Sequence, residues 1–71
     1  MSSYLIVIEP TDTGFSAYAP DVDGCVATGA TREEVTESMR EALAFHLEGL
    51  REAGRSIPPS TSDAAFVDVA A

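Results

Sequence analysis

The chain of 71 residues has one cysteine, one histidine and no lysine. A single cysteine, Cys25, excludes a disulfide within the chain, and together with His46 it offers too few ligands for a zinc framework. A domain this short has a small core and often needs a disulfide, a metal or a partner chain to be stable. We therefore expect no metal and no cofactor, and we expect assembly with other chains.

Positive charge is scarce, because four arginines face twelve acidic residues and the formal net charge is -8. A nucleic-acid-binding domain normally carries a basic face, so most of this surface should repel phosphate backbones. We expect no direct binding of nucleic acid. The same charge can steer a basic protein towards the chain, or it can simply keep a small protein soluble.

Long apolar runs are also absent. The run near the N-terminus, from Tyr4 to Ile8, has five residues and follows no positively charged segment. It is too short for the core of a signal peptide or for a membrane span. With the unpaired cysteine, this favours a cytoplasmic protein that makes no membrane contact.

Short β-prone segments alternate with turn-forming residues, and one long amphipathic segment separates the third from the fourth. Thr31 and Glu34 have the spacing of a capping box, apolar residues then recur every three or four positions, and Gly54 provides a stop signal. This pattern predicts a helix over residues 32–53. The predicted strands span residues 4–9, 14–19, 25–29 and 65–69.

The order β-β-β-α-β predicts a single α+β domain. A right-handed crossover through the helix would place the last strand beside the first, giving a mixed four-stranded sheet of order 3-2-1-4 with the helix on one face. The first strand is apolar on both faces, and the helix is longer than the strands. Both features favour a second protein surface, for which we expect an oligomer interface at Tyr4, Ile6, Ile8 and Tyr18.

The stretch PDVDG, residues 20–24, contains two nearby carboxylates, Asp21 and Asp23. It is not an EF-hand loop, because glycine follows the second aspartate directly. Proline before the aspartates and glycine after them fit a turn. The alternatives are a contact with a partner and, less favoured, a magnesium-dependent nuclease site that includes Glu9.

The second half of the helix carries three further candidates. Phe45 lies off the apolar stripe and can either anchor an interface or widen the core face. Gly49 within the helix suggests close approach of another backbone. His46 has no designated nucleophile or orienting carboxylate, so we interpret it as a core or interface residue. For partner binding we expect Asp21, Asp23, Gly24, Phe45 and Glu48.

Two stretches of this chain resemble the HicB-type antitoxins of bacterial toxin–antitoxin pairs. They are GFSAYAPDVDGCVATGATREEV, which starts at Gly14, and EALAFHLEGLREAGRSIPPS, which ends at Ser60. The resemblance implies a partial ribonuclease-H-like fold, assembly as a dimer or tetramer, and binding to a small basic RNA-cleaving toxin of the HicA type. It implies a scaffold without catalysis, since two-metal cleavage needs carboxylates gathered from several elements.

The leading hypothesis is therefore a non-enzymatic antitoxin of a type II pair. Many members of the family carry a C-terminal DNA-binding segment, and we expect it to be absent here because the chain ends at Ala71, directly after the last predicted strand. Two alternatives come from other classes. One is a solitary oligomeric scaffold without a toxin, and the other is a ribonuclease-H-like nuclease that uses magnesium.

Overall fold

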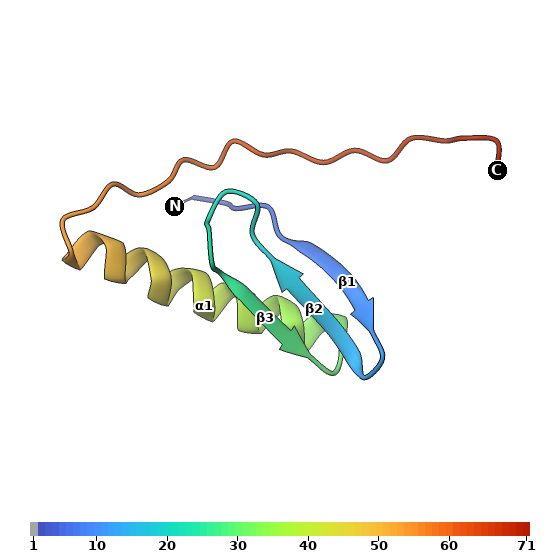
Figure 1. The fold of residues 1–71 in the computed structure, drawn as a ribbon, viewed down its shortest axis with the longest axis horizontal. Helices are drawn as coiled ribbons and strands as arrows, with labels where there is room; N and C mark the ends of the chain where they lie inside the picture. Colours follow the sequence, from blue (N-terminus) through green and yellow to red (C-terminus); the bar gives the residue numbers. More distant parts are fainter. Residues whose placement is uncertain (1) are drawn as a thin grey trace.

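The computed structural model describes residues 2–71. In this range a three-stranded antiparallel sheet of order β1-β2-β3 packs against one helix (Figure 1). The elements are β1 (Val7–Thr11), β2 (Gly14–Tyr18), β3 (Val26–Gly29) and α1 (Arg32–Glu52). The predicted α+β class is confirmed, and the helix, β2 and β3 lie within one residue of their expected bounds.

Local hydrogen bonds explain where α1 begins and ends. The side chain of Thr31 accepts a hydrogen bond from the Glu34 N–H at 3.0 Å, and the Glu34 carboxylate accepts one from the Ala30 N–H at 2.9 Å. These bonds satisfy N–H groups that have no partner inside the helix. At the other end Gly54 has a φ of 71° and donates to the Arg51 carbonyl at 3.1 Å. The left-handed conformation at Gly54 ends the helix.

The core lies between α1 and one face of the sheet. Close packing there depends on glycine, because a Cβ on Gly29 would lie 2.7 Å from the backbone nitrogen of Val35. Only a residue without a side chain lets the strand approach the first turns of the helix so closely. The buried residues are Ala17, Ala19, Val22, Cys25, Val35 and Met39.

Strand pairing sorts the apolar residues of β1 onto two faces. Ile8 pairs with Ala17, which is buried beneath α1, whereas Val7 pairs with the exposed Tyr18. Tyr18 in turn pairs with the exposed Val26 of β3. The sheet face opposite the helix therefore carries an apolar row across all three strands, which we call the open-face row (Val7, Tyr18 and Val26). As expected, β1 is apolar on both faces.

The predicted fourth strand is wrong, and with it the sheet order 3-2-1-4. Residues 55–71 follow the helix as an extended segment without strand pairing, and β1 begins at Val7 instead of residue 4 (Figure 1). This segment first passes the N-terminus, where the Tyr4 hydroxyl donates to the Pro58 carbonyl at 2.5 Å. Residues 65–69 lie beyond this contact and pair with no strand of residues 2–71, so they have no ladder to join.

Figure 1 also shows that the C-terminal half of α1 extends past the strands, as its length predicted. No strand lies beside the C-terminal half of α1 in the described residues; its neighbours are loops and the segment that follows the helix. Within residues 2–71 the structure holds no helix with both the length and the hydrophobicity to cross a membrane.

Candidate functional site

The stretch between β2 and β3 is a compact turn, as the sequence predicted. Val22 donates to the Ala19 carbonyl at 3.2 Å, and Cys25 donates to the Val22 carbonyl at 3.4 Å. Gly24 has a φ of 77°, a conformation that residues with side chains rarely adopt. Val22 and Cys25 point into the core, which leaves Asp23 and Gly24 exposed at the surface.

Asp21 is bound within the chain, to residues 40 and 41 positions away. Its carboxylate accepts hydrogen bonds from the N–H groups of Thr61 and Ser62, each at 2.9 Å, and from the Ser62 hydroxyl at 2.7 Å. The Thr61 hydroxyl donates a longer bond at 3.3 Å. We call this arrangement the Asp21 clamp, because it joins the turn to the segment that follows the helix.

The clamp changes the acidity of Asp21. The hydrogen bonds from the Ser62 hydroxyl and N–H favour the ionised form and hold the pKa of the Asp21 carboxyl below its ordinary value. The clamp should therefore persist at neutral pH and weaken only in acid, as the pH falls through this lowered pKa. Burial raises the pKa of the Cys25 thiol, which keeps it protonated and unreactive.

Next to the turn, the end of α1 and the start of the extended segment border a shallow cleft of about 590 Å³. The cleft brings together groups that are far apart in the sequence, including the two aspartates and the only histidine. Its lining residues are Asp21, Val22, Asp23, His46, Leu50, Arg55, Ser56 and Pro58. The two predicted partner-binding aspartates therefore share one surface with the helix end.

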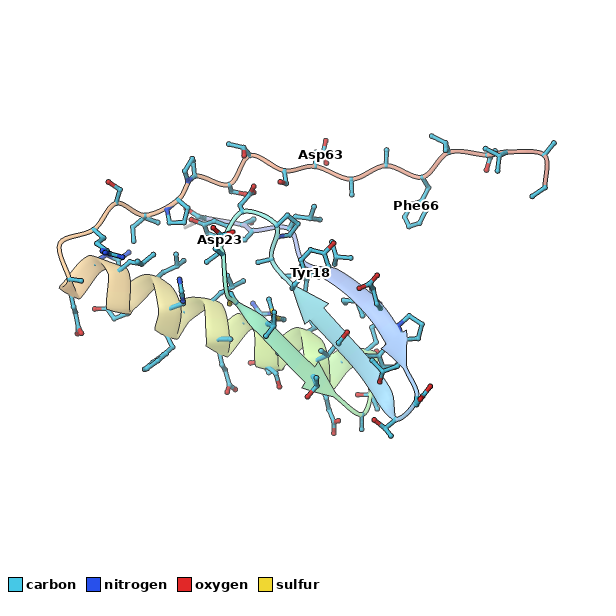
Figure 2. The ribbon with its side chains drawn as sticks, in the orientation of Figure 1. Tyr18, Asp23, Asp63 and Phe66 are labelled. Atoms are coloured by element: carbon cyan, nitrogen blue, oxygen red, sulfur yellow. The ribbon has the colours of Figure 1, made fainter. Side chains whose placement is uncertain are left out.

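The other predicted partner-binding residues lie outside the lining of this cleft. Phe45 is 84% exposed, which resolves its two interpretations in favour of a surface position. Glu48 is exposed and pairs with Arg51 at 2.8 Å one turn along α1. Such a surface pair contributes little to stability, so its charges remain available to a partner. Figure 2 shows Asp23 in the turn above the helix.

The nuclease hypothesis needs carboxylates that converge on a metal. Glu9 pairs with Ser16 in the β1–β2 ladder, and the oxygens of Asp21 already serve the clamp. Among residues 2–71, no group of three or more histidine, cysteine, aspartate or glutamate side chains is arranged to hold a metal ion.

Comparison with known proteins places this fold in a family. The model of the HicB-like antitoxin of the bacterial toxin–antitoxin system matches residues 4–69. The chain belongs to the HicB-like antitoxin family. The resemblance carried by the two sequence stretches is thus confirmed.

Individual relatives agree with this assignment. Antitoxin HicB 2 of Photorhabdus laumondii is 36% identical over 96% of this chain, and an uncharacterized 14.9 kDa protein of Haemophilus phage HP1 is 39% identical over 80% of it. A chain of the HicA3 and HicB3 toxin–antitoxin complex superposes with a TM-score of 0.72 and 38% identity, over 84% of this chain and 70% of that one. The present chain spans about half the length of these curated relatives, 43% of one and 50% of the other.

In this HicB-like domain the residues expected at an oligomer interface do not form one surface. Tyr4, Ile6 and Ile8 pack against the core on the helix side of the sheet. Tyr18 lies on the opposite face, in the open-face row. An interface built on Tyr18 would therefore include Val7 and Val26 in place of the other three.

Sequence reasoning about the HicB-like chain missed the Asp21 clamp. The only local signal is an aspartate in a turn, which is fully explained by the turn itself. The partners Thr61 and Ser62 lie in a stretch rich in serine, threonine and proline that has no periodic pattern. Only the folded chain brings the two stretches together.

The clamp leads to a prediction about amide exchange. Substituting Asp21→Ala should make the N–H groups of Thr61 and Ser62 exchange with solvent severalfold faster, because both lose their acceptor. Asp23→Ala, which removes an exposed carboxylate from the same turn, is the matched control and should leave both rates unchanged. Hydrogen exchange followed by NMR at neutral pH measures this. Equal rates in the two variants would show that the clamp does not hold the segment in solution.

Proposed function

We propose that this protein is the non-enzymatic antitoxin of a type II toxin–antitoxin pair, which binds a small basic RNA-cleaving toxin of the HicA type and blocks its active site. The proposal is carried by the similarity to a chain of the HicA3 and HicB3 toxin–antitoxin complex, at 38% identity and a TM-score of 0.72. Membership of the HicB-like antitoxin family supports it over most of the chain.

Charge and exposure indicate how such a partner would be recognised. The net charge of -8 attracts a basic protein and accelerates the encounter. The proposed toxin-binding surface consists of Asp23 and Gly24 at the turn and Phe45 and Glu48 on α1, with Asp21 holding the turn and the following segment in place. Phe45, at 84% exposure, supplies an apolar anchor within an acidic surround.

We further propose that the antitoxin acts in the cytoplasm as a homo-oligomer, a dimer or a tetramer. The six buried residues found among residues 2–71 form a core that is small for an independent domain. In the open-face row, the exposed side chains of Tyr18 and Val26 favour contact with a second protein surface.

The proposal is tested by mixing the protein with a purified HicA-type toxin and following cleavage of an RNA substrate. We expect an excess of the protein to abolish cleavage and the two proteins to elute together in gel filtration. Undiminished cleavage at excess, with separate elution, would refute the proposal.

Two substitutions with the same change of charge locate the toxin-binding surface. Glu48→Arg should weaken binding about tenfold, because it places a positive charge against a basic partner. Asp12→Arg changes the net charge equally, but it lies in the exposed β1–β2 turn and should change affinity only slightly, through the long-range field. Isothermal titration against the toxin compares them. Equal losses would show that net charge, and not this surface, determines binding.

A further inference from the structure

The last nine residues, 63–71, form an exposed extended segment that we call the C-terminal arm. Phe66, Val67 and Val69 are 104%, 80% and 75% exposed. Figure 2 labels Asp63 and Phe66 on this segment. Along an extended chain, successive side chains point to opposite sides. Val67 and Val69 therefore share one side of the arm, while Phe66 shares the other with Asp68. An apolar, β-prone segment left in water in this way is typical of a binding element.

The same chain carries an unfilled groove between residues 2–6 and one flank of α1, with a volume of about 860 Å³. Ile6, Leu43 and Leu47 supply apolar surface, and Ile57 closes one rim. Two of the four arginines of the whole chain, Arg40 and Arg51, also line it. The groove therefore combines an apolar lining with positive charge, in a protein whose formal net charge is -8.

The arm of the same chain is directed away from this groove. The preceding residues follow the groove's rim, where the Ser60 hydroxyl donates to the Ser3 carbonyl. The Asp21 clamp then fixes Ser62, and the arm departs beyond the N-terminus (Figure 1). Nine extended residues span about 30 Å, which is long enough to reach a neighbouring molecule.

We infer that the arm of a second copy of this chain occupies the groove, and that two copies exchange arms reciprocally in a two-fold symmetric dimer. Arm and groove match in character, since Val67 and Val69 meet an apolar lining and Asp63, on the same side of the arm, meets the positive charge of Arg40 or Arg51. The ion pairs that now hold these arginines, to Glu37 and Glu48, are exposed and weak enough to rearrange.

Reciprocal exchange also explains how two chains of charge -8 associate. Like-charged surfaces repel each other. At the groove this repulsion is reduced, because the positive side chains of Arg40 and Arg51 line the contact. In a two-fold symmetric dimer each arm fills the groove of the other copy, so neither an arm nor a groove is left free and the assembly closes at two copies. The inference specifies the contact behind the proposed homo-oligomer and does not depend on toxin binding.

Two full-length variants separate the donor from the acceptor. Val67→Asp replaces an apolar side chain of the arm with a negative charge. Ala44→Glu places a negative charge at an exposed position that lines the groove. Ala71→Asp adds the same charge at the end of the chain and serves as the matched control. Native mass is measured by sedimentation at micromolar concentration, without toxin, after circular dichroism has shown that each variant is folded.

We expect the wild type and Ala71→Asp to sediment at twice the 7.5 kDa chain mass, and each of the other two variants to dissociate at least tenfold more readily. An equimolar mixture of Val67→Asp and Ala44→Glu should recover dimers, because one intact arm then meets one intact groove. Variants that remain dimeric would overturn arm exchange but leave homo-oligomerisation standing. A monomeric wild type would refute both, and a mixture that stays monomeric would overturn the exchange.

Discussion

Substituting Gly29→Ala should destabilise the domain by about 1–3 kcal/mol, the usual cost of forcing extra atoms into a packed core. The new Cβ would lie 2.7 Å from the Val35 nitrogen and 3.0 Å from its Cα. These are backbone atoms at the start of α1, so the helix would have to move away from the sheet. In a domain with so small a core, this is a large part of the total stability. Urea unfolding followed by circular dichroism measures the loss.

Gly49→Ala is the matched control for Gly29→Ala. It makes the same substitution in the interior of α1, where a Cβ would meet no atom within 4 Å. Alanine is the better helix former by about 1 kcal/mol, so the urea midpoint should rise instead of fall. Midpoints that move in the same direction in both variants would contradict the close helix–sheet packing at Gly29.

Met39→Ala should have the second large effect, a loss of about 2–5 kcal/mol. Met39 is fully buried in the centre of the helix face that packs on the sheet. Its truncation removes the largest fully buried side chain of the described residues and leaves a cavity in the core between α1 and the sheet. Because a core of this size supplies about 3–5 kcal/mol, the variant should be largely unfolded at 25 °C. Far-ultraviolet circular dichroism detects the lost helix.

Phe45→Ala removes a larger side chain from the same helix and provides the control. Phe45 is 84% exposed, so its truncation should change the free energy of unfolding by no more than about 0.5 kcal/mol. Comparable losses in both variants would mean that α1 packs with a different face towards the sheet. The same variant should weaken toxin binding, which separates its role at the surface from any role in folding.

Several features of this protein follow from short stretches of sequence. The capping box at Thr31 and Glu34 and the stop at Gly54 placed the helix, because caps act through hydrogen bonds over three or four residues. The turn at PDVDG was predicted in part from the conformational freedom of Gly24, but the Asp21 carboxylate, expected to bond the nearby backbone, accepts hydrogen bonds from Thr61 and Ser62. Simple alternation showed that β1 is apolar on both faces, but the residues Tyr4, Ile6 and Ile8, which we expected at an oligomer interface, lie on the side that packs against the core.

The errors concern contacts between distant residues. Residues 65–69 have the composition of a strand, but strand formation requires a paired edge, and this segment finds none within its own chain. Within the chain, no atom lies within 4 Å of a Cβ placed on Gly49, and the close approach of two backbones is found at Gly29, since sequence shows a glycine but not which backbone faces it. The sequence allowed Phe45 to lie either in the core or at the surface. In the structure the packing of α1 on the sheet leaves it at the surface.

Local patterning alone therefore sufficed for the helix, the two hairpin connections, the acidic surface and the resemblance to HicB-like antitoxins, because each depends on residues near one another in the chain. The course of residues 55–71 was settled only by folding. A clamp between Asp21 and Ser62 joins positions 41 residues apart, and its hydrogen bonds exist only after the turn and the helix have set both ends in place.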